Sequence, residues 1–188
     1  MELSDSEVMA RAVCEPELFV HVFDRHGRAV HAYLARRAGS QAADDVMGEV
    51  WLQAFRSRDR FNTNWSDARP WLYGIARNAL RAHWRSRYRS ERHADAGSAD
   101  PWEDVDVRLD AARRAPTLRA ALAALPDKDL EVLLLVAWEQ LSPTEAAVSL
   151  GIPAGTVRWR LHRARASLRR QLGDDLGDVN GFETVMEV

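Results

Sequence analysis

Apolar side chains recur at helical spacing through residues 151–172, and this pattern constrains the fold more than any other feature. Five of them follow one another at steps of four, three, four and four residues, which places them on one side of an α-helix: Val157, Leu161, Ala164, Leu168 and Leu172. The same segment holds six arginines and no acidic residue. We therefore predict a helix with one face in a core and a cationic face directed at a polyanion such as nucleic acid.

The residues before this helix indicate a second, shorter one. Ser142 and Glu145 form a capping box with Pro143 at the first helical position, and Gly151 is placed to end the helix in a left-handed conformation. Short helix, glycine turn and basic helix are typical of a helix-turn-helix, whose second helix reads base edges in the major groove. The alternative is a solvated charged face, which predicts mixed signs and i,i+4 ion pairs that this segment lacks.

Composition excludes several classes of protein. The net charge is −2, so the chain is not basic overall. Cys14 is the only cysteine, which rules out a disulfide framework and a thiolate zinc cluster. The longest apolar run, residues 132–138, is too short to span a bilayer, and the acidic N-terminus does not resemble a signal peptide. We expect a cytoplasmic protein without membrane insertion, cofactor or metal.

Charge is distributed in blocks. Residues 69–92 contain seven arginines and one acid, whereas residues 95–110 contain six acids and one arginine. Residues 173–188 contain five acids and no base. Two basic patches are therefore separated, and followed, by acidic segments.

The remaining pattern is helical throughout, with no convincing alternating strand. We predict helices over residues 4–14, 16–38 (bent near Gly27), 40–57 and 70–90, and then over 117–125, 128–139 and the two helices of the helix-turn-helix. The fold class is all-α, with two small helical domains: residues 1–92 and 116–173, joined by an acidic linker, 93–115, and followed by an acidic tail, 174–188.

The helix predicted over residues 70–90 carries a second basic face. Arginines and aromatics alternate there, opposite an apolar side: Arg77, Asn78, Arg81, Trp84, Arg85 and Tyr88. This combination suits single-stranded or melted DNA, because guanidinium groups hold phosphates and exposed rings stack on unpaired bases. The neighbouring loop offers Phe61, Asn62, Asn64 and Trp65, which could receive an extruded base. Packing of the aromatic rings against a neighbouring helix is the alternative.

Two stretches resemble a known family. DARPWLYGIARNALRAHWRSR, with DDVMGEVWLQAF before it, resembles region two of extracytoplasmic-function (ECF) sigma factors. ALAALPDKDLEVLLLVAWEQLSPTEAAVSLGIPAGTVRWRLHRARASLRRQL resembles their region four. The resemblance implies a dissociable subunit that binds core RNA polymerase, through the clamp helices of the largest subunit and the flap, and directs it to promoter DNA. It also implies restraint by an anti-sigma factor.

The resemblance assigns roles to residues at the matching positions. Reading of the minus-thirty-five element falls to Thr156, Arg158, Trp159, Arg160, His162, Arg163 and Arg165. Recognition and melting of the minus-ten element fall to Phe61, Asn62, Asn64, Trp65, Trp71, Arg77, Asn78, Arg81, Trp84 and Arg85. Contact with core polymerase falls to Asp44, Asp45, Glu49 and Trp51. Three positions depart from the usual family pattern: Gly48, Ala82 and Trp159.

Two other functions compete with this one. A stand-alone helix-turn-helix regulator would share the C-terminal half but would leave residues 42–55 and 71–90 unexplained. A DNA-acting enzyme would need a metal site or a nucleophile. Asp45 and Glu49 stand four residues apart, but no third ligand follows at suitable spacing. We therefore expect a protein that is not an enzyme.

Overall fold

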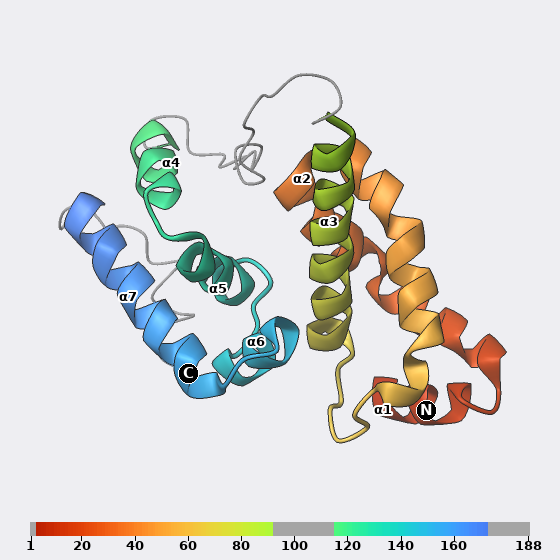
Figure 1. Ribbon diagram of the computed structural model, residues 1–188. Helices are drawn as coiled ribbons and strands as arrows, with labels where there is room; N and C mark the ends of the chain where they lie inside the picture. The colour runs from red at the N-terminus through yellow and green to blue at the C-terminus, as the bar shows by residue number, and fades with distance from the viewer. Residues whose placement is uncertain (1–2, 92–114, 173–188) are drawn as a thin grey trace. The chain divides into compact units, whose positions relative to one another are not determined.

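The computed structural model describes residues 3–91 and 115–172, and the elements in both ranges are helices (Figure 1). The chain divides into two compact units, as predicted. The first contains α1 (Asp5–Ala12), the 3₁₀ turn η1 (Pro16–Phe19), α2 (Val20–Arg56), the 3₁₀ turn η2 (Arg58–Arg60) and α3 (Arg69–Glu91). The second contains α4 (Ala115–Ala123), α5 (Asp127–Ala137), α6 (Pro143–Leu150) and α7 (Ala154–Leu172). The predicted acidic linker and tail lie outside the described residues.

Helix α1 begins at a capping box formed by Ser4 and Glu7. The Ser4 backbone N–H donates to the Glu7 carboxylate at 2.7 Å, and the Glu7 N–H donates to the Ser4 hydroxyl at 3.4 Å. Val8 and Ala12 are fully buried, so one face of this short helix joins the core of the first unit. Burial of a side chain such as Val8 stabilises the fold by about 1.5–3 kcal/mol.

Helix α2 differs from its prediction in two places. A turn was expected at residues 39–40, and Gly39 does leave helical geometry there, with φ 77° and ψ 163°, but the helix resumes at once. The expected bend near Gly27 is wrong, because Gly39 is the sole non-helical residue inside α2. A glycine weakens a helix by only about 1 kcal/mol, and the fully buried Val22 and Val30 on either side hold Gly27 in place.

Helix α3 lies along α2 and closes the core of the first unit (Figure 1). Leu72 and Ala76 are fully buried, as their helical spacing predicts. Tyr33 of α2 stacks on Tyr73 of α3 with ring centroids 4.8 Å apart. The buried Arg37 guanidinium covers the Tyr33 ring at 3.7 Å. Sequence periodicity predicts the inward Tyr33, but it gives no sign of a buried arginine beside it.

In the second unit, α4, α5 and α6 all pack against α7. Every residue from 129 to 136 of α5 is buried, and the helix predicted over residues 128–139 is present. Val157 and Ala164 of α7 are fully buried and Leu161 nearly so, whereas Leu168 and Leu172 are half-buried. The predicted apolar stripe is therefore confirmed and is most deeply buried in the first half of the helix.

None of the described helices combines the length and the apolarity that crossing a bilayer requires.

Candidate nucleic-acid interface

Helices α6 and α7 form the helix-turn-helix that the sequence predicts. The Ser142 N–H donates to the Glu145 carboxylate at 2.8 Å, and the Glu145 N–H donates to the Ser142 hydroxyl at 3.2 Å. Gly151 ends α6 with φ 64° and ψ 37°, the left-handed conformation that favours glycine. The Ile152 N–H then donates to the Ala147 carbonyl at 3.2 Å, which tightens the turn into α7.

One side of α7 presents basic side chains at helical spacing. Arg158, His162, Arg165 and Arg169 follow at steps of four, three and four residues, and together with Leu161 and Pro143 they line a hollow of about 250 Å³. Desolvation, followed by repulsion from Arg169, lowers the pKa of Arg165. An anion in this hollow would relieve that repulsion, and the N-terminus of α6 beside it favours negative charge.

Arg163, which is predicted to read the minus-thirty-five element, forms an ion pair within the second unit. Its Nη2 donates to Asp129 Oδ1 at 2.7 Å, and its Nε donates to the other carboxylate oxygen. Hydrogen bonding to this carboxylate raises the pKa of Arg163. No acid lies within α7, and the partner of Arg163 comes from α5 instead. Thr156, Arg160 and Arg165 are partly exposed, and Arg158, Trp159 and His162 are exposed.

The outer face of α3 has the composition expected for contact with nucleic acid. Asn78, Arg81 and Arg85 are exposed, and Arg77 is partly exposed. Trp84 is also partly exposed, and the Arg87 guanidinium lies 5.4 Å from its ring centroid. Part of the Trp84 ring is therefore accessible to solvent. The side chain of Tyr88 lies outside the described residues.

The loop before α3 separates its aromatic residues from its amides. Asn62 and Asn64 are exposed, and the Asn62 Oδ1 accepts the Asn64 N–H at 3.1 Å, which fixes a local turn. Phe61 is a correction, because its ring is buried and meets Trp71 edge-to-face at 5.5 Å. It therefore anchors the loop and is not available to stack on a base. Trp65 is half-buried.

The second half of α2 bears an acidic face. Asp44, Asp45 and Glu49 are exposed, and Asp44 accepts a 2.8 Å hydrogen bond from His31. Trp51 is a correction to the predicted polymerase contacts, since its ring is buried between Phe19 and Phe23. Its role in the described structure is to join the two halves of α2 through aromatic packing.

Asp5 forms a junction that the sequence did not reveal. Its carboxylate accepts hydrogen bonds from Arg25 at 2.9 Å, from His26 at 2.6 Å and from the Ala68 backbone N–H at 2.9 Å. Burial favours the neutral acid, but these hydrogen bonds outweigh it and lower the pKa of Asp5 to about 2. Asp5 thus ties α1 to α2 and to the end of the loop that carries Asn62 and Asn64.

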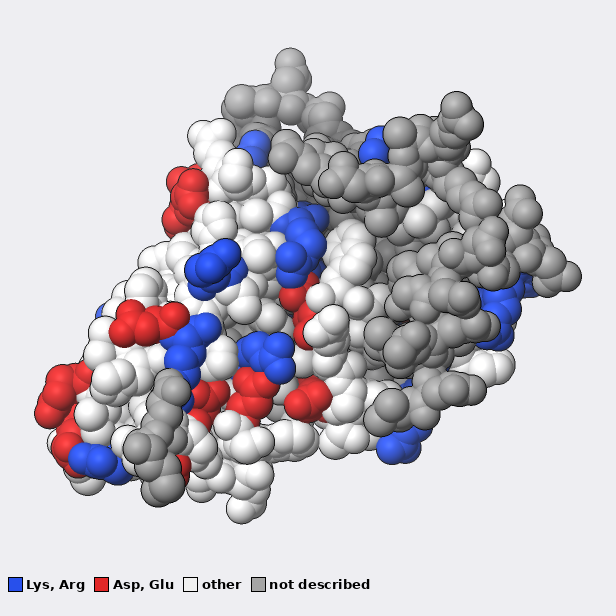
Figure 2. All heavy atoms as spheres, turned by 180° about the vertical axis from the view of Figure 1, so that it is seen from behind, with Lys and Arg blue, Asp and Glu red and all other residues white. Residues whose placement is uncertain are grey.

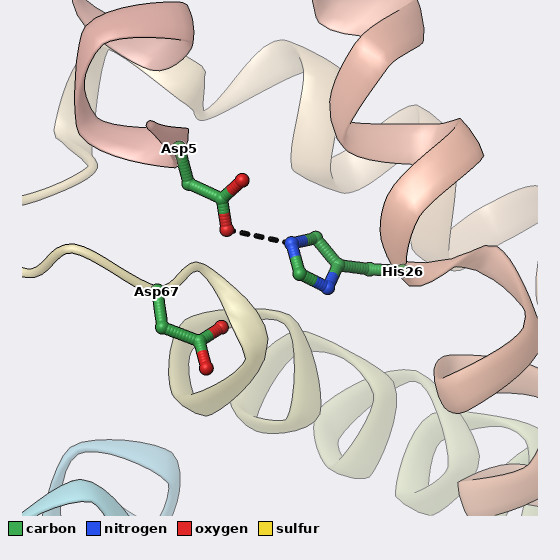
Figure 3. A group of neighbouring side chains, drawn as sticks. All are labelled: Asp5, His26 and Asp67. Carbon is green, nitrogen blue, oxygen red and sulfur yellow. Dashed lines mark hydrogen bonds and ion pairs between the residues drawn. The ribbon is translucent and has the colours of Figure 1, made fainter. Parts of the chain in front are cut away.

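Asp5 is directed at His26 with Asp67 beside them (Figure 3), and one ligand atom from each of the three lies within 4.8 Å of the others. Each carboxylate is already occupied by N–H donors. Asp67 accepts the Arg69 backbone N–H at 2.8 Å and the Arg69 Nε at 2.7 Å. The cluster is accounted for as a set of hydrogen bonds and ion pairs that joins three segments.

Acidic and basic side chains are interspersed on the face of the molecule that Figure 2 shows. The surface there is not a single-sign coat, which agrees with the net charge of −2. The cationic character therefore belongs to individual helix faces, above all to those of α3 and α7.

Comparison with known proteins decides the family. The family model for Sigma-70 region 2 matches residues 22–90, and that for Sigma-70, region 4 matches residues 117–168. The RNA polymerase sigma factor HrpL of Pseudomonas syringae pv. syringae is 33% identical over 149 residues, which cover 76% of this chain and 80% of HrpL. The ECF RNA polymerase sigma factor SigL of Mycobacterium tuberculosis is 30% identical over 169 residues, which cover 89% of this chain and 96% of SigL.

The chain belongs to the ECF group of the sigma-70 family. A solved structure of CnrH, in complex with the cytosolic domain of CnrY, aligns with a TM-score of 0.61 and 25% identity, covering 91% of this sigma factor and 98% of CnrH. The chain is thus an RNA polymerase sigma factor, a DNA-binding subunit that serves transcription initiation. A stand-alone helix-turn-helix regulator is not favoured, because that reading leaves the region 2 match unexplained.

Two acidic residues of this sigma factor that position functional segments escaped the sequence analysis. Asp5 resembles an ordinary first-turn acid of α1, and Asp129 resembles an ordinary first-turn acid of α5. Both are buried, and both bind arginines distant in the chain. No local pattern distinguishes them, because their partners are brought to them by tertiary packing.

Proposed function

We propose that α7 reads the minus-thirty-five element of the promoter from the major groove. Direct contact with DNA is assigned to Thr156, Arg158, Trp159, Arg160, His162 and Arg165, and Arg163, which Asp129 holds, belongs to the same face and supports it. Exposed arginines can bind guanine O6 and N7 in bidentate fashion or hold phosphates. The geometry of the helix-turn-helix and the cationic hollow beside the α6 N-terminus support the assignment.

The outer face of α3 and the loop before it recognise and melt the minus-ten element in this proposal. Arg77, Asn78, Arg81 and Arg85 hold the DNA backbone, while Trp84 and Trp65 stack on unpaired bases, each worth about 1–3 kcal/mol. Asn62 and Asn64 offer amide groups to an extruded base. Phe61 and Trp71 support the loop from beneath, which follows from their mutual packing.

The acidic face of α2 binds the clamp helices of core RNA polymerase in this proposal. Its polar contacts are Asp44, Asp45 and Glu49, which are exposed, while Trp51 stiffens the helix from within. The second unit meets the flap. Restraint by an anti-sigma factor is part of the same proposal, supported by the likeness to CnrH, whose structure is a complex with CnrY.

The protein acts in the cytoplasm, where RNA polymerase and the chromosome are, and has no catalytic activity of its own. The observation that carries the proposal is the presence, in one chain, of a region 2 unit with an acidic α2 face and a region 4 unit with a cationic α7 face.

Reconstitution with core RNA polymerase tests the proposal. The full chain should co-purify with the core enzyme and support run-off transcription from a subset of genomic fragments. The double variant Asp45→Arg and Glu49→Arg should lose co-purification while retaining DNA binding. Asp24→Arg, at another exposed acid of α2, is the matched control and should still co-purify. Failure of the unaltered chain to bind the core enzyme would contradict the proposal.

Promoter opening is tested separately with permanganate, which reacts with unpaired thymines. Trp84→Ala should leave polymerase binding unchanged and reduce the reactivity over the minus-ten element, whereas Trp84→Phe should retain most of it. Equal permanganate reactivity with the unaltered chain, Trp84→Ala and Trp84→Phe would contradict the stacking role of Trp84.

A further inference from the structure

Three side chains form a continuous link from the interior of the second unit to the surface of α7. Asp129 of α5 accepts two hydrogen bonds from Arg163 of α7, one of them at 2.7 Å. The guanidinium carbon of Arg163 lies 4.2 Å from the centroid of the Trp159 ring. Trp159 and Arg163 are four residues apart, so they are neighbours on one face of α7.

Burial is graded along this link. The Asp129 side chain is 1% exposed, and that of Arg163 is 47% exposed. If Arg163 turned away to contact DNA, it would leave a buried carboxylate without its cation, which is strongly unfavourable. The guanidinium is therefore held by its Nε and Nη2 against Asp129, with its carbon over the Trp159 ring.

Trp159 is the most exposed large apolar side chain among the described residues, at 56%. One face of its ring rests on the Arg163 guanidinium, an arrangement that cation–π attraction stabilises. The ring lies in the first half of α7, the part of a recognition helix that meets base edges. A bulky ring is thus fixed where smaller or mobile side chains could have adapted to several bases.

We propose that Trp159 is a specificity-determining residue that recognises the methyl group of a thymine, and that Asp129 and Arg163 are its positioning residues. The thymine C5-methyl is the one apolar group that base pairs present in the major groove. An indole surface can exclude water from that methyl, whereas it cannot make the bidentate contacts that arginine makes with guanine. This inference rests on the proposed placement of α7 in the promoter major groove.

Replacement of thymine by uracil tests the contact, since uracil lacks only the methyl. The full chain, bound to core polymerase, is used to select duplexes from a random-sequence pool. Each thymine of the selected minus-thirty-five element is then replaced singly by deoxyuridine. We expect one or two positions at which affinity falls about fourfold, the value of one buried methyl group. In Trp159→Ala, uracil and thymine should bind equally at those positions, and Trp159→Phe should retain part of the difference.

A thymine–uracil difference that persists undiminished in Trp159→Ala would overturn the inference, as would a selected element with no sensitive position. Failure to select any duplex would overturn the proposed function itself, and this inference with it. The two failures are therefore distinguishable.

The positioning role is tested with Asp129→Asn, which keeps the size of the side chain and removes its charge. We expect the ratio of the affinities for thymine and uracil duplexes to fall toward one. The salt dependence of binding should stay unchanged, because no phosphate contact is lost. Arg163→Lys keeps the charge but not the planar group under the indole, so it should show the same loss and serves if Asp129→Asn does not fold. Arg170→Lys, at an exposed arginine of the same helix, is the control and should keep the full difference. The positioning role would be overturned if Asp129→Asn and Arg163→Lys both discriminated between thymine and uracil as well as the unaltered protein does.

Discussion

At the scale of single residues, buried carboxylates determine how the binding surfaces are held. Asp5 fixes the start of α1, the first half of α2 and the end of the loop at Ala68 through three hydrogen bonds. Asp129 fixes the exposed Arg163. In both cases a buried carboxylate is stabilised by hydrogen-bond donors from other segments. Removal of its charge should therefore also destabilise the segments that carry those donors.

Asp5→Asn should destabilise the first unit by about 2 kcal/mol at neutral pH, because the pKa of Asp5 is lowered from 3.8 to about 2 on folding. An acid whose pKa is lower in the folded state stabilises the protein at pH values above its pKa in the unfolded state. This stabilisation is lost as the pH falls through the pKa of the folded state. The difference between the unaltered protein and Asp5→Asn should therefore be constant above about pH 4 and vanish toward pH 2. Urea unfolding at a series of pH values measures it.

Glu7→Gln is the matched control, since Glu7 is exposed on the same helix and glutamine can keep the capping box. It should change stability far less than Asp5→Asn. A gap that stays constant down to pH 2 would show that the Asp5 ionisation is not coupled to folding.

Arg158→Ala should weaken binding to all duplexes to a similar degree and lower the salt slope by about one. Arg158 lines the hollow of α7, and its side chain forms no hydrogen bond or ion pair with the other described residues. Titration of promoter duplexes at several salt concentrations provides the slope. Lys128→Ala, an exposed cation of α5, is the control, and an equal change in the slope there would contradict a specific role for the hollow.

At the scale of helices, two glycines of α2 differ in whether their backbone conformation requires glycine. Gly39 holds φ 77° and ψ 163°, a region that residues with a Cβ rarely enter, whereas Gly48 lies within regular α2 geometry. A Cβ built at either position meets no heavy atom within 4 Å. Space is therefore equal at the two sites, and only the backbone conformation differs.

Gly39→Ala should consequently destabilise the protein by about 1–3 kcal/mol, and Gly48→Ala should stabilise it by about 1 kcal/mol. Thermal unfolding of the two variants beside the unaltered protein measures both. Equal shifts in the same direction would show that the Gly39 conformation is not required by the fold.

The periodicity of apolar residues explains why the helices and their buried faces could largely be predicted from the sequence. The apolar residues of α1, α3, α5 and α7 are buried at the expected positions, and the caps at Ser4, Ser142 and Gly151 are present. The error at Gly27 arose because local propensity alone cannot weigh the tertiary packing of Val22 and Val30. The errors at Phe61 and Trp51 arose because an aromatic residue suits both a core and a stacking surface.

At the scale of the whole molecule, the chain consists of two compact units, each with its own core. The hydrogen bonds of Asp5 lie within the first unit, and those of Asp129 with Arg163 lie within the second. Each unit therefore has the contacts needed to respond alone to a local change.

Hydrogen exchange should show this independence. Asp5→Asn should speed exchange within residues 3–91 and leave residues 115–172 unchanged, and Asp129→Asn should do the reverse. Accelerated exchange in both units on either change would mean that the two units unfold as one.

The sequence alone determined the helical class, the two units, the helix-turn-helix and the family resemblance, because periodicity, caps and motif spacing are local properties of the chain. Only the tertiary structure decided which of the proposed contacts are available. It buried Phe61 and Trp51, and it paired Arg163 with Asp129. The physical reason is that the partner of a buried charge or ring lies far away in sequence, so nothing near the residue records whether it faces solvent or another helix.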